Sequence, residues 1–298
     1  MQNTIVPFLL KCLGYLPLGI VRVIGILIGK AMWSLKGRDY RVTLKNIQLC
    51  FPELEKNQQL QLVRESLIET AKTAAEAGVI WHKSWAWLQT KIVAVEGEDI
   101  LRAELGLGKG LIVLAPHLGN WEVVAPYLAS IAPLTAMYKP LPIPKLDKLV
   151  YAGRSKLNIN MAPTNRKGVS MLLKALQAGT IVGVLPDQNP EKGAGGEAVP
   201  FFGRLAMTMS LVHSLMNRTQ CRVVAVFAMR VAGGYKLITT PVVTEMYSEN
   251  IHESLQGMNK SIEQCVRMAP VQYQWEYNRF RKLPAVSAVA GSGEEKSN

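Results

Sequence analysis

The sequence predicts one α/β domain in which helices flank a mixed sheet, preceded by a membrane-associated helix. Beyond residue 90, short apolar runs alternate with amphipathic segments, as expected for a sheet with covering helices. No linker-like stretch interrupts residues 90–285, and the first 35 residues are strongly apolar. We therefore expect a membrane helix over residues 1–35, a single domain over residues 36–284 and a disordered tail over residues 285–298.

The apolar N-terminal stretch from Ile5 to Leu35 is long enough to cross a bilayer core, which takes roughly 20 residues. It lacks an A-x-A cleavage site, so we expect it to be retained. Lys11 and Arg22 fall on one face of a helix, and a charge near the middle of a span costs roughly 2.5–3.5 kcal/mol. A tilted or interfacial helix, kinked at Pro17, therefore fits the sequence as well as a spanning helix does.

Positive charge points to an anionic partner and to one side of a membrane. The chain carries 34 Lys and Arg against 22 Asp and Glu, a net charge of +12. Phospholipid, a phosphorylated glycolipid, an acidic carrier protein and nucleic acid all fit this charge. The four scattered cysteines form no CxxC pair, which fits a reducing compartment. A basic cluster directly after the apolar stretch predicts that the domain lies on the cytoplasmic face, and it comprises Lys36, Arg38, Arg41 and Lys45.

The predicted elements begin with a helix from Glu53 to Gly78, where apolar residues recur at helical spacing and Gly78 is the expected stop. Trp81, Trp85 and Trp87 follow this helix, and they fit either a packed core or a membrane interface. The expected strands are Ile92–Val95, Leu111–Ala115, Leu134–Tyr138, Ile181–Leu185, Arg222–Met229 and Tyr235–Thr240. The expected helices are Asp99–Leu105, Trp121–Ser130, Pro144–Lys156, Gly168–Ala178, Thr208–Arg218 and Asn250–Met268.

The strongest chemical signal is the segment GLIVLAPHLGNWEVVAPYLA. Its apolar strand ends at Pro116, His117 opens a short loop, and Asn120 is a candidate cap of the following helix. The loop lets Glu122, in the first helical turn, reach back to one imidazole nitrogen and leave the other free as a general base. Taken alone, the spacing of His117 and Glu122 also fits a structural histidine.

Basic and acidic residues beyond this segment are candidates for binding a lipid substrate. Arg166 just precedes a predicted helix whose N-terminus also favours anions. Asp187, in the strand-end motif LPDQ, is suited to position an arginine, cap a loop or support the histidine. The glycine-rich loop that ends in Phe201, Phe202 and Gly203 suggests a flexible edge of an acyl groove. The basic candidates are Lys139, Arg154, Arg166 and Lys167.

The spacing of His117 and Glu122 resembles the HxxxxD/E motif of the bacterial lipid A biosynthesis acyltransferases, which use acyl-acyl carrier protein. The resemblance extends over nearly the whole chain, with several segments in family order. These are NIQLCFPE at Asn46–Glu53, LPDQ at Leu185–Gln188, VPFFGRLAMT at Val199–Thr208 and MAPVQYQWEYNRFRKLP at Met268–Pro284.

The resemblance implies an enzyme on the cytoplasmic face of the inner membrane that acylates a hydroxyl of a lipid A precursor. It implies that His117 is the general base, that Glu122 orients it, and that Arg154 ranks first among the substrate-binding candidates Arg154, Arg166, Asp187 and Lys139. It implies acyl carrier protein as the donor's carrier, with no metal, no other cofactor and no nucleic-acid partner. Three alternatives stay open: acylation of a lysophospholipid or another glycolipid from acyl carrier protein or acyl-CoA, lipid hydrolysis, and non-catalytic binding of a basic surface to membranes.

Overall fold

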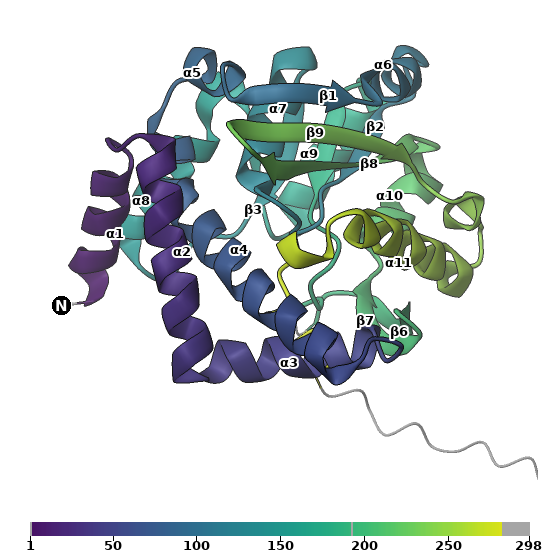
Figure 1. Cartoon of the computed structure of the whole chain (residues 1–298). Coiled ribbons are helices and arrows are strands. Elements are labelled where there is room, and N and C mark those ends of the chain that lie inside the picture. Colours follow the sequence, from purple (N-terminus) through teal and green to yellow (C-terminus); the bar gives the residue numbers. More distant parts are fainter. Residues whose placement is uncertain (1, 192, 282–298) are drawn as a thin grey trace, which may run out of the picture.

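The fold is built on a sheet of seven strands, and the computed structural model describes residues 2–191 and 193–281. The strands are β1 (Ile92–Glu96), β2 (Leu111–Leu114), β3 (Leu134–Tyr138), β4 (Asn160–Pro163), β5 (Ile181–Val184), β8 (Arg222–Val231) and β9 (Gly234–Pro241). Their order is β1-β9-β8-β2-β5-β3-β4, and Figure 1 shows β1, β9 and β8 side by side. Strands β8, β2, β5, β3 and β4 are mutually parallel, whereas β9 and β1 run in the opposite direction. The prediction of a mixed sheet is confirmed.

The central strand β2 is buried on both of its faces. Ile112 and Leu114 pack into one core cluster, whereas Leu111 and Val113 pack into a second. Because side chains alternate along a strand, these two clusters lie on opposite faces of the sheet. A strand that is covered on both faces has a continuous run of apolar residues, and the segment LIVL is such a run.

Helices cover both faces of the sheet. On one face, α9 (Arg166–Gln177), α10 (Leu211–Thr219) and α11 (Ile251–Met268) pack against the cluster that contains Ile112. On the other face, α6 (Glu98–Gly106) and α7 (Val124–Ile131) pack against the cluster that contains Leu111. The remaining helices are α1 (Gln2–Leu13), α2 (Leu18–Leu35), α3 (Arg38–Cys50), α4 (Lys56–His82), α5 (Trp85–Gln89) and α8 (Pro144–Arg154), and the 3₁₀ turns are η1 (Trp121–Val123), η2 (Lys156–Asn158), η3 (Thr244–Tyr247) and η4 (Pro270–Gln272).

All six predicted strands are present, but the sequence did not predict β4 or the separate hairpin of β6 (Gly196–Phe201) and β7 (Arg204–Met209). Thr208, the expected first residue of a helix, lies in β7, and α10 begins only at Leu211. The turn between β6 and β7 uses positive φ angles of 49° at Phe202 and 69° at Gly203, as tight hairpins do. The glycine-rich loop was expected to be flexible up to Gly203, but Gly196–Phe201 forms β6 and Phe201 and Phe202 are buried in the core, so that expectation is wrong for this part of it.

The apolar N-terminal stretch forms two helices, α1 and α2, where one kinked helix was expected. Pro17 lies between them and directly precedes α2, a position that needs no backbone N–H donor. The predicted helix stop at Gly78 is also wrong, because α4 continues to His82. A Cβ at Gly78 would lie 2.3 Å from the carbonyl oxygen of Leu10, so this glycine allows α1 to pack directly on α4.

Helix α2 lies along α4 through close contacts at glycines (Figure 1). A Cβ at Gly25 would lie 2.6 Å from the Cα atom of Lys72, and a Cβ at Gly29 would lie 2.4 Å from that of Ile68. Helix backbones approach this closely only where side chains are missing or very small. Within the described ranges, α2 is the one helix that is long and apolar enough to cross a membrane by length and composition.

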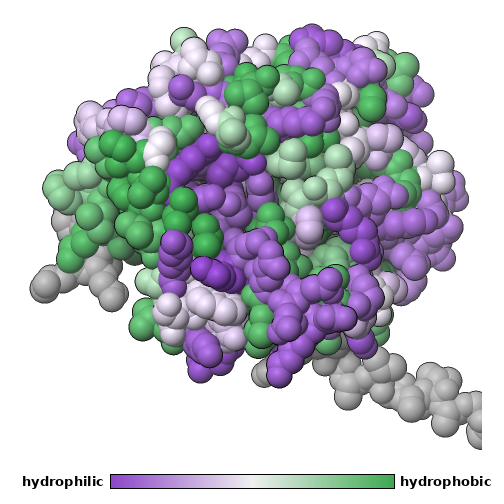
Figure 2. All heavy atoms as spheres, viewed as in Figure 1, coloured by the Kyte–Doolittle hydropathy of each residue, from purple (hydrophilic) through white to green (hydrophobic). Residues whose placement is uncertain are grey.

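The outer surfaces of α1 and α2 are apolar. Figure 2 shows hydrophobic side chains gathered over these two helices. The large exposed ones are Ile5, Val6, Phe8, Leu9, Ile20, Val23, Leu27, Ile28 and Leu35. The treatment of residues 1–35 as a separate membrane unit stays a prediction, and the tail predicted over residues 285–298 lies outside the described residues.

Candidate active site

The carboxyl ends of the parallel strands bring four of the predicted site residues to one edge of the sheet. His117 follows β2, Lys139 follows β3, Arg166 follows β4 and Asp187 follows β5. Strands β2 and β5 are neighbours, and His117 and Asp187 each lie three positions beyond the paired residues that end these strands. In open α/β sheets, sites form at this edge.

His117 and Asp187 are joined by two hydrogen bonds. The imidazole Nδ1 lies 2.8 Å from Asp187 Oδ1, and the backbone N–H of His117 donates to Oδ2 at 2.8 Å. The Asp187 side chain is only 2% exposed. Burial alone would raise the pKa of this carboxyl, but the attraction and hydrogen bonds from His117 outweigh burial, so the pKa lies below the ordinary value of 3.8. An ionised Asp187 therefore accepts the Nδ1 proton.

The second ring nitrogen of His117 carries a lone pair when the ring is neutral. Because Nδ1 donates to a carboxylate, Nε2 is the unprotonated nitrogen of the neutral ring. The Gln188 Nε2 atom lies 3.2 Å from His117 Nε2, so the amide donates to this lone pair. The His117 side chain is partly exposed, and its ring packs edge-on against Trp121. A hydroxyl that displaces the Gln188 amide would meet a base already oriented toward it.

Glu122 binds Arg154 and Trp81, and the hydrogen bond that was predicted between Glu122 and His117 is made by Asp187 instead. Arg154 forms a two-pronged salt bridge with Glu122, with Nε 3.0 Å from Oε2. The Trp81 indole N–H donates to the same oxygen at 2.8 Å. The physical reason is position: Asp187 arrives from the strand adjacent to β2, whereas Glu122 lies on η1 facing α8 and the end of α4.

The electrostatics of Glu122 match this assignment. Burial raises the pKa of the Glu122 carboxyl, but the Arg154 charge, followed by the hydrogen bonds from Arg154 and Trp81, holds it below the ordinary value of 4.5. Attraction to His117 contributes in the same direction but less than Arg154 does. Glu122 is therefore a buried carboxylate near the histidine, but it accepts its hydrogen bonds from Arg154 and Trp81.

The loop after His117 is fixed by backbone hydrogen bonds on two sides. Gly119 donates to the Gln272 carbonyl at 3.0 Å, and Asn120 donates to the Ala228 carbonyl at 2.8 Å. Gly119 has a φ of 64°, and a Cβ there would lie 2.0 Å from the Ala228 carbonyl oxygen. Only glycine fits both the left-handed conformation and the close approach.

A buried ionic network lies beneath this loop and includes the side chain of Asn120. Glu76 is fully buried and accepts hydrogen bonds from Asn120 Nδ2 at 2.9 Å, Arg22 Nε at 2.7 Å and Arg230 Nε at 2.9 Å. Asn120 makes no side-chain cap of the following turn, so the predicted capping role is wrong. The network connects α2, α4 and β8 to the loop that carries His117.

The substrate-binding candidates have different surroundings. Lys139 pairs with Glu191 and is largely exposed, and Arg166 is the exposed first residue of α9. Arg154 is held against Glu122. Substrate binding by these three residues and by Asp187 stays a prediction. Within the described ranges, no group of three or more His, Cys, Asp or Glu side chains is arranged to hold a metal ion.

Sequence reasoning missed two contributors to the site. Gln188 directly follows Asp187 in the same strand-end motif, and that position was the available signal for it. The only sequence signal at Trp81 was that it lies in a tryptophan-rich stretch, and this does not predict a hydrogen bond to Glu122.

Known proteins resemble this chain along most of its length. The lipid A biosynthesis lauroyltransferase of Escherichia coli is 26% identical over 277 residues, which cover 90% of this chain and 88% of that protein. The palmitoleoyltransferase of lipid A biosynthesis from the same organism is 26% identical over 90% of this chain and 87% of its own length. The corresponding myristoyltransferase is 24% identical over 83% of this chain and 77% of its own length.

The family described as "Bacterial lipid A biosynthesis acyltransferase" matches residues 2–282, which include every strand of the sheet and every residue of the candidate site. The resemblance inferred from the sequence motifs and the expectation of an O-acyltransferase are both confirmed by this match. The chain belongs to the bacterial lipid A biosynthesis acyltransferase family.

Proposed function

We propose that this protein transfers a fatty acyl chain from an acyl-acyl carrier protein thioester to a hydroxyl of a lipid A precursor. The similar proteins of Escherichia coli are named for lauroyl, palmitoleoyl and myristoyl transfer in lipid A biosynthesis, which supports a long-chain acyl donor and a lipid A-type acceptor. The observation that carries the proposal is the His117 ring, whose Nδ1 is held by Asp187 and whose Nε2 faces the amide of Gln188.

In the proposed reaction, His117 Nε2 removes the proton of the acceptor hydroxyl as its oxygen attacks the thioester carbonyl. The carbon–sulfur bond then breaks, the acyl group stays on the acceptor oxygen, and the imidazolium returns its proton to the leaving thiolate. Asp187 stabilises the transient imidazolium, because its buried carboxylate already accepts the Nδ1 proton at 2.8 Å. Transfer is direct, so no acyl-enzyme forms.

In this proposal, Glu122 acts on the site through Arg154 and not through the histidine ring. The salt bridge fixes the guanidinium of Arg154, which would otherwise be free to move on the side of α8. A fixed cation near the histidine is suited to bind a phosphate of the acceptor or to stabilise the oxyanion of the attacked carbonyl. The backbone amides at the start of η1, directly after the His117 loop, are the alternative oxyanion donors.

We further propose that α1 and α2 hold the enzyme on the cytoplasmic face of the inner membrane, lying in the interface. The exposed apolar side chains of both helices support membrane contact. Helix α2 packs along α4, and the charged residues Lys72 and Glu76 of α4 lie against it, so a spanning α2 would bring these charges into the bilayer. The exposed basic residues at the start of α3, Arg38 and Arg41, suit the anionic cytoplasmic leaflet.

The test uses purified wild-type protein and a His117→Ala variant, supplied with acyl-acyl carrier protein and a lipid A precursor in detergent micelles. The proposal expects mass spectrometry to show one acyl chain added by the wild type and a rate lower by at least about 10²-fold for the variant. Wild-type transfer by His117→Ala would refute the base assignment. Preferential transfer to a lysophospholipid would refute the proposed acceptor. Release of free fatty acid without acylated lipid would refute the transfer reaction.

A further inference from the structure

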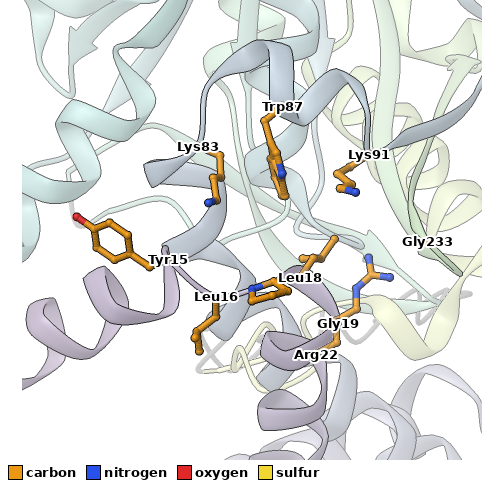
Figure 3. A pocket seen from close by; sticks show the side chains of 10 residues that line it. Tyr15, Leu16, Leu18, Gly19, Arg22, Lys83, Trp87, Lys91 and Gly233 are labelled. Carbon is orange, nitrogen blue, oxygen red and sulfur yellow. The ribbon is translucent and has the colours of Figure 1, made fainter.

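A pocket of about 450 Å³ lies at the elbow between α1 and α2, and none of the site residues His117, Glu122 or Asp187 lines it (Figure 3). Its walls come from four parts of the chain. These are the elbow itself at residues 15–19, Arg22 of α2, the segment with Lys83, Trp87 and Lys91, and the turn between β8 and β9 at Gly233.

The pocket is cationic. Lys83 and Lys91 both lie close to Trp87, with their ammonium nitrogens 5.9 and 5.7 Å from the ring centroid. No acidic residue lines the pocket, and neither lysine forms a salt bridge in the part of the chain that the structure describes. Arg22 also lines the pocket, although its guanidinium donates to Glu76 and to the Val231 carbonyl. Two lysines without salt bridges among the described residues thus line the same pocket, and Figure 3 shows Trp87 between them.

A helix N-terminus adds to this positive potential. Helix α2 has 18 residues and begins at Leu18, inside the pocket wall. Its first turn contains no acidic residue, and Pro17 before it provides no side-chain cap. The partial positive charge of the helix start is therefore not neutralised by the protein. The combination of the lysines and this helix start is suited to an anion such as phosphate.

The surface of the two N-terminal helices next to the pocket is apolar. The lining residue Tyr15 is 61% exposed, and Ile20 and Val23, which directly follow the lining residues Gly19 and Arg22 in α2, are 50% and 54% exposed. Tyr15 and Trp87 are residues of the kind that gather at the level of lipid headgroups. An anion that sits beside an exposed apolar helix surface is most simply one that carries its own hydrocarbon chains.

We propose that this pocket binds the headgroup phosphate of an anionic glycerophospholipid, whose acyl chains lie against the exposed apolar face of α1 and α2. Lys83 and Lys91 attract the phosphate from the two sides of Trp87, and the first turn of α2 donates backbone N–H groups to it. The site is separate from the acyl-transfer site and fixes how the protein sits on the membrane. Its occupant is a lipid of the bilayer and not the substrate.

The test measures flotation of the full-length protein with vesicles of phosphatidylcholine alone and of phosphatidylcholine mixed with phosphatidylglycerol. The pocket variant is Lys83→Gln/Lys91→Gln. The charge-matched control is Lys109→Gln/Arg218→Gln, two exposed residues at the opposite edge of the sheet. Circular dichroism of both variants checks the fold, and we expect it to be unchanged because Lys83 and Lys91 make no salt bridge.

The proposal expects wild-type binding to be stronger on the phosphatidylglycerol vesicles. The pocket variant should lose about 30-fold of that binding, at about 1 kcal/mol for each basic residue near an anionic surface, and the control less than about threefold. Equal losses in the two variants would overturn the proposal, because charge alone would then explain binding. Displacement of the wild type by millimolar inorganic phosphate would indicate a free-anion site and would also overturn it.

A kinetic arm separates this site from the acceptor site. In micelles without phospholipid, the pocket variant should keep the KM of the wild type for the lipid A precursor. A tenfold higher KM with unchanged vesicle binding would assign the pocket to the acceptor and refute the proposed lipid. If the wild-type protein showed no transferase activity, the proposed function would be refuted. The vesicle assay would still test the lipid site, because it measures binding independently of acyl transfer.

Discussion

Replacing Asp187 by asparagine should abolish most catalysis while it preserves the fold, and the reason lies in the two hydrogen bonds that the carboxylate accepts. One comes from the backbone N–H of His117 and the other from its ring Nδ1, both at 2.8 Å. The backbone N–H is always a donor, so the single oxygen of an asparagine must face it. The asparagine NH₂ group then faces Nδ1, which can accept only if the ring proton moves to Nε2.

The magnitude follows from this change of tautomer. A ring protonated at Nε2 offers no lone pair to the acceptor hydroxyl, so the whole contribution of general-base catalysis is lost. That contribution is typically about 10²–10⁴-fold, which corresponds to about 3–5 kcal/mol in the activation barrier. The loss should fall mainly on kcat, because asparagine keeps the shape of the side chain and the substitution removes the base that acts in the transition state.

The assay compares acyl transfer by purified Asp187→Asn and Glu122→Gln variants under identical conditions, with thermal melting as the measure of folding. Glu122→Gln removes the charge that Arg154 binds but leaves the bond between His117 and Asp187 intact. We expect it to retain more activity than Asp187→Asn. If Asp187→Asn stays within about threefold of the wild type while Glu122→Gln loses about 10²-fold, Glu122 orients the histidine and our assignment is incorrect.

Three further predictions concern stability. Gly119→Ala should cost about 1–3 kcal/mol, because the φ of 64° and the 2.0 Å approach to a carbonyl oxygen both exclude a Cβ, and an unchanged Tm would show that the loop adjusts. Arg230→Met should lower the free energy of unfolding by about 3–5 kcal/mol, because the buried Glu76 carboxylate would lose one of the two arginines that neutralise it. Denaturant titration measures this change, and a loss below about 1 kcal/mol would contradict the prediction. The third prediction concerns pH. The carboxyl pKa values of Asp187 and Glu122 lie below their ordinary values of 3.8 and 4.5. The two ionised carboxylates therefore stabilise the folded protein fully above those ordinary values, and this stabilisation is lost as the pH falls through the lower pKa values of the folded state. The Tm difference between wild type and Glu122→Gln/Asp187→Asn should therefore shrink on acidification, and a difference that stays constant down to about pH 3 would speak against ionised carboxylates.

Six of the seven strands of the sheet could be predicted from the sequence, and the central ones were recognisable as buried apolar runs. LIVL of β2 and IVGV of β5 are short, branched and bounded by turn residues, so periodicity and length identify them. Strand β4 escaped prediction because Asn160 and Pro163 suppress the apolar signal in a strand of four residues. Its pairing with β3 comes from tertiary structure, which local propensity does not contain.

The site was predictable in its location and only partly in its bonding. The position of His117 after an apolar strand placed it at the carboxyl edge of the sheet. The partner of its ring depends on which strand lies beside β2, and the sequence does not state strand order. Asp187 lies 70 positions away in the chain, whereas Glu122 is five away, so a reading based on local spacing favours the wrong carboxylate.

The ionic network around Glu76 affects how a water-soluble form of this enzyme is best obtained. Arg22 belongs to the apolar helix α2, yet it shares the Glu76 carboxylate with Asn120 of the loop that carries His117. Deleting residues 1–35 would remove one of the cations that neutralise this carboxylate and would uncover the face of α4 that α2 protects. The shortened enzyme should therefore be impaired even when its acceptor is delivered in detergent.

Resurfacing is the better route to solubility. The outward side chains of α2, such as Val23 and Leu27, make up much of its exposed apolar area and lie away from Glu76. Polar replacements there would reduce the exposed apolar area of α2 and leave the Arg22 contact in place. The N-terminal helices would then be kept for their support of the loop that carries His117, independently of any role as an anchor.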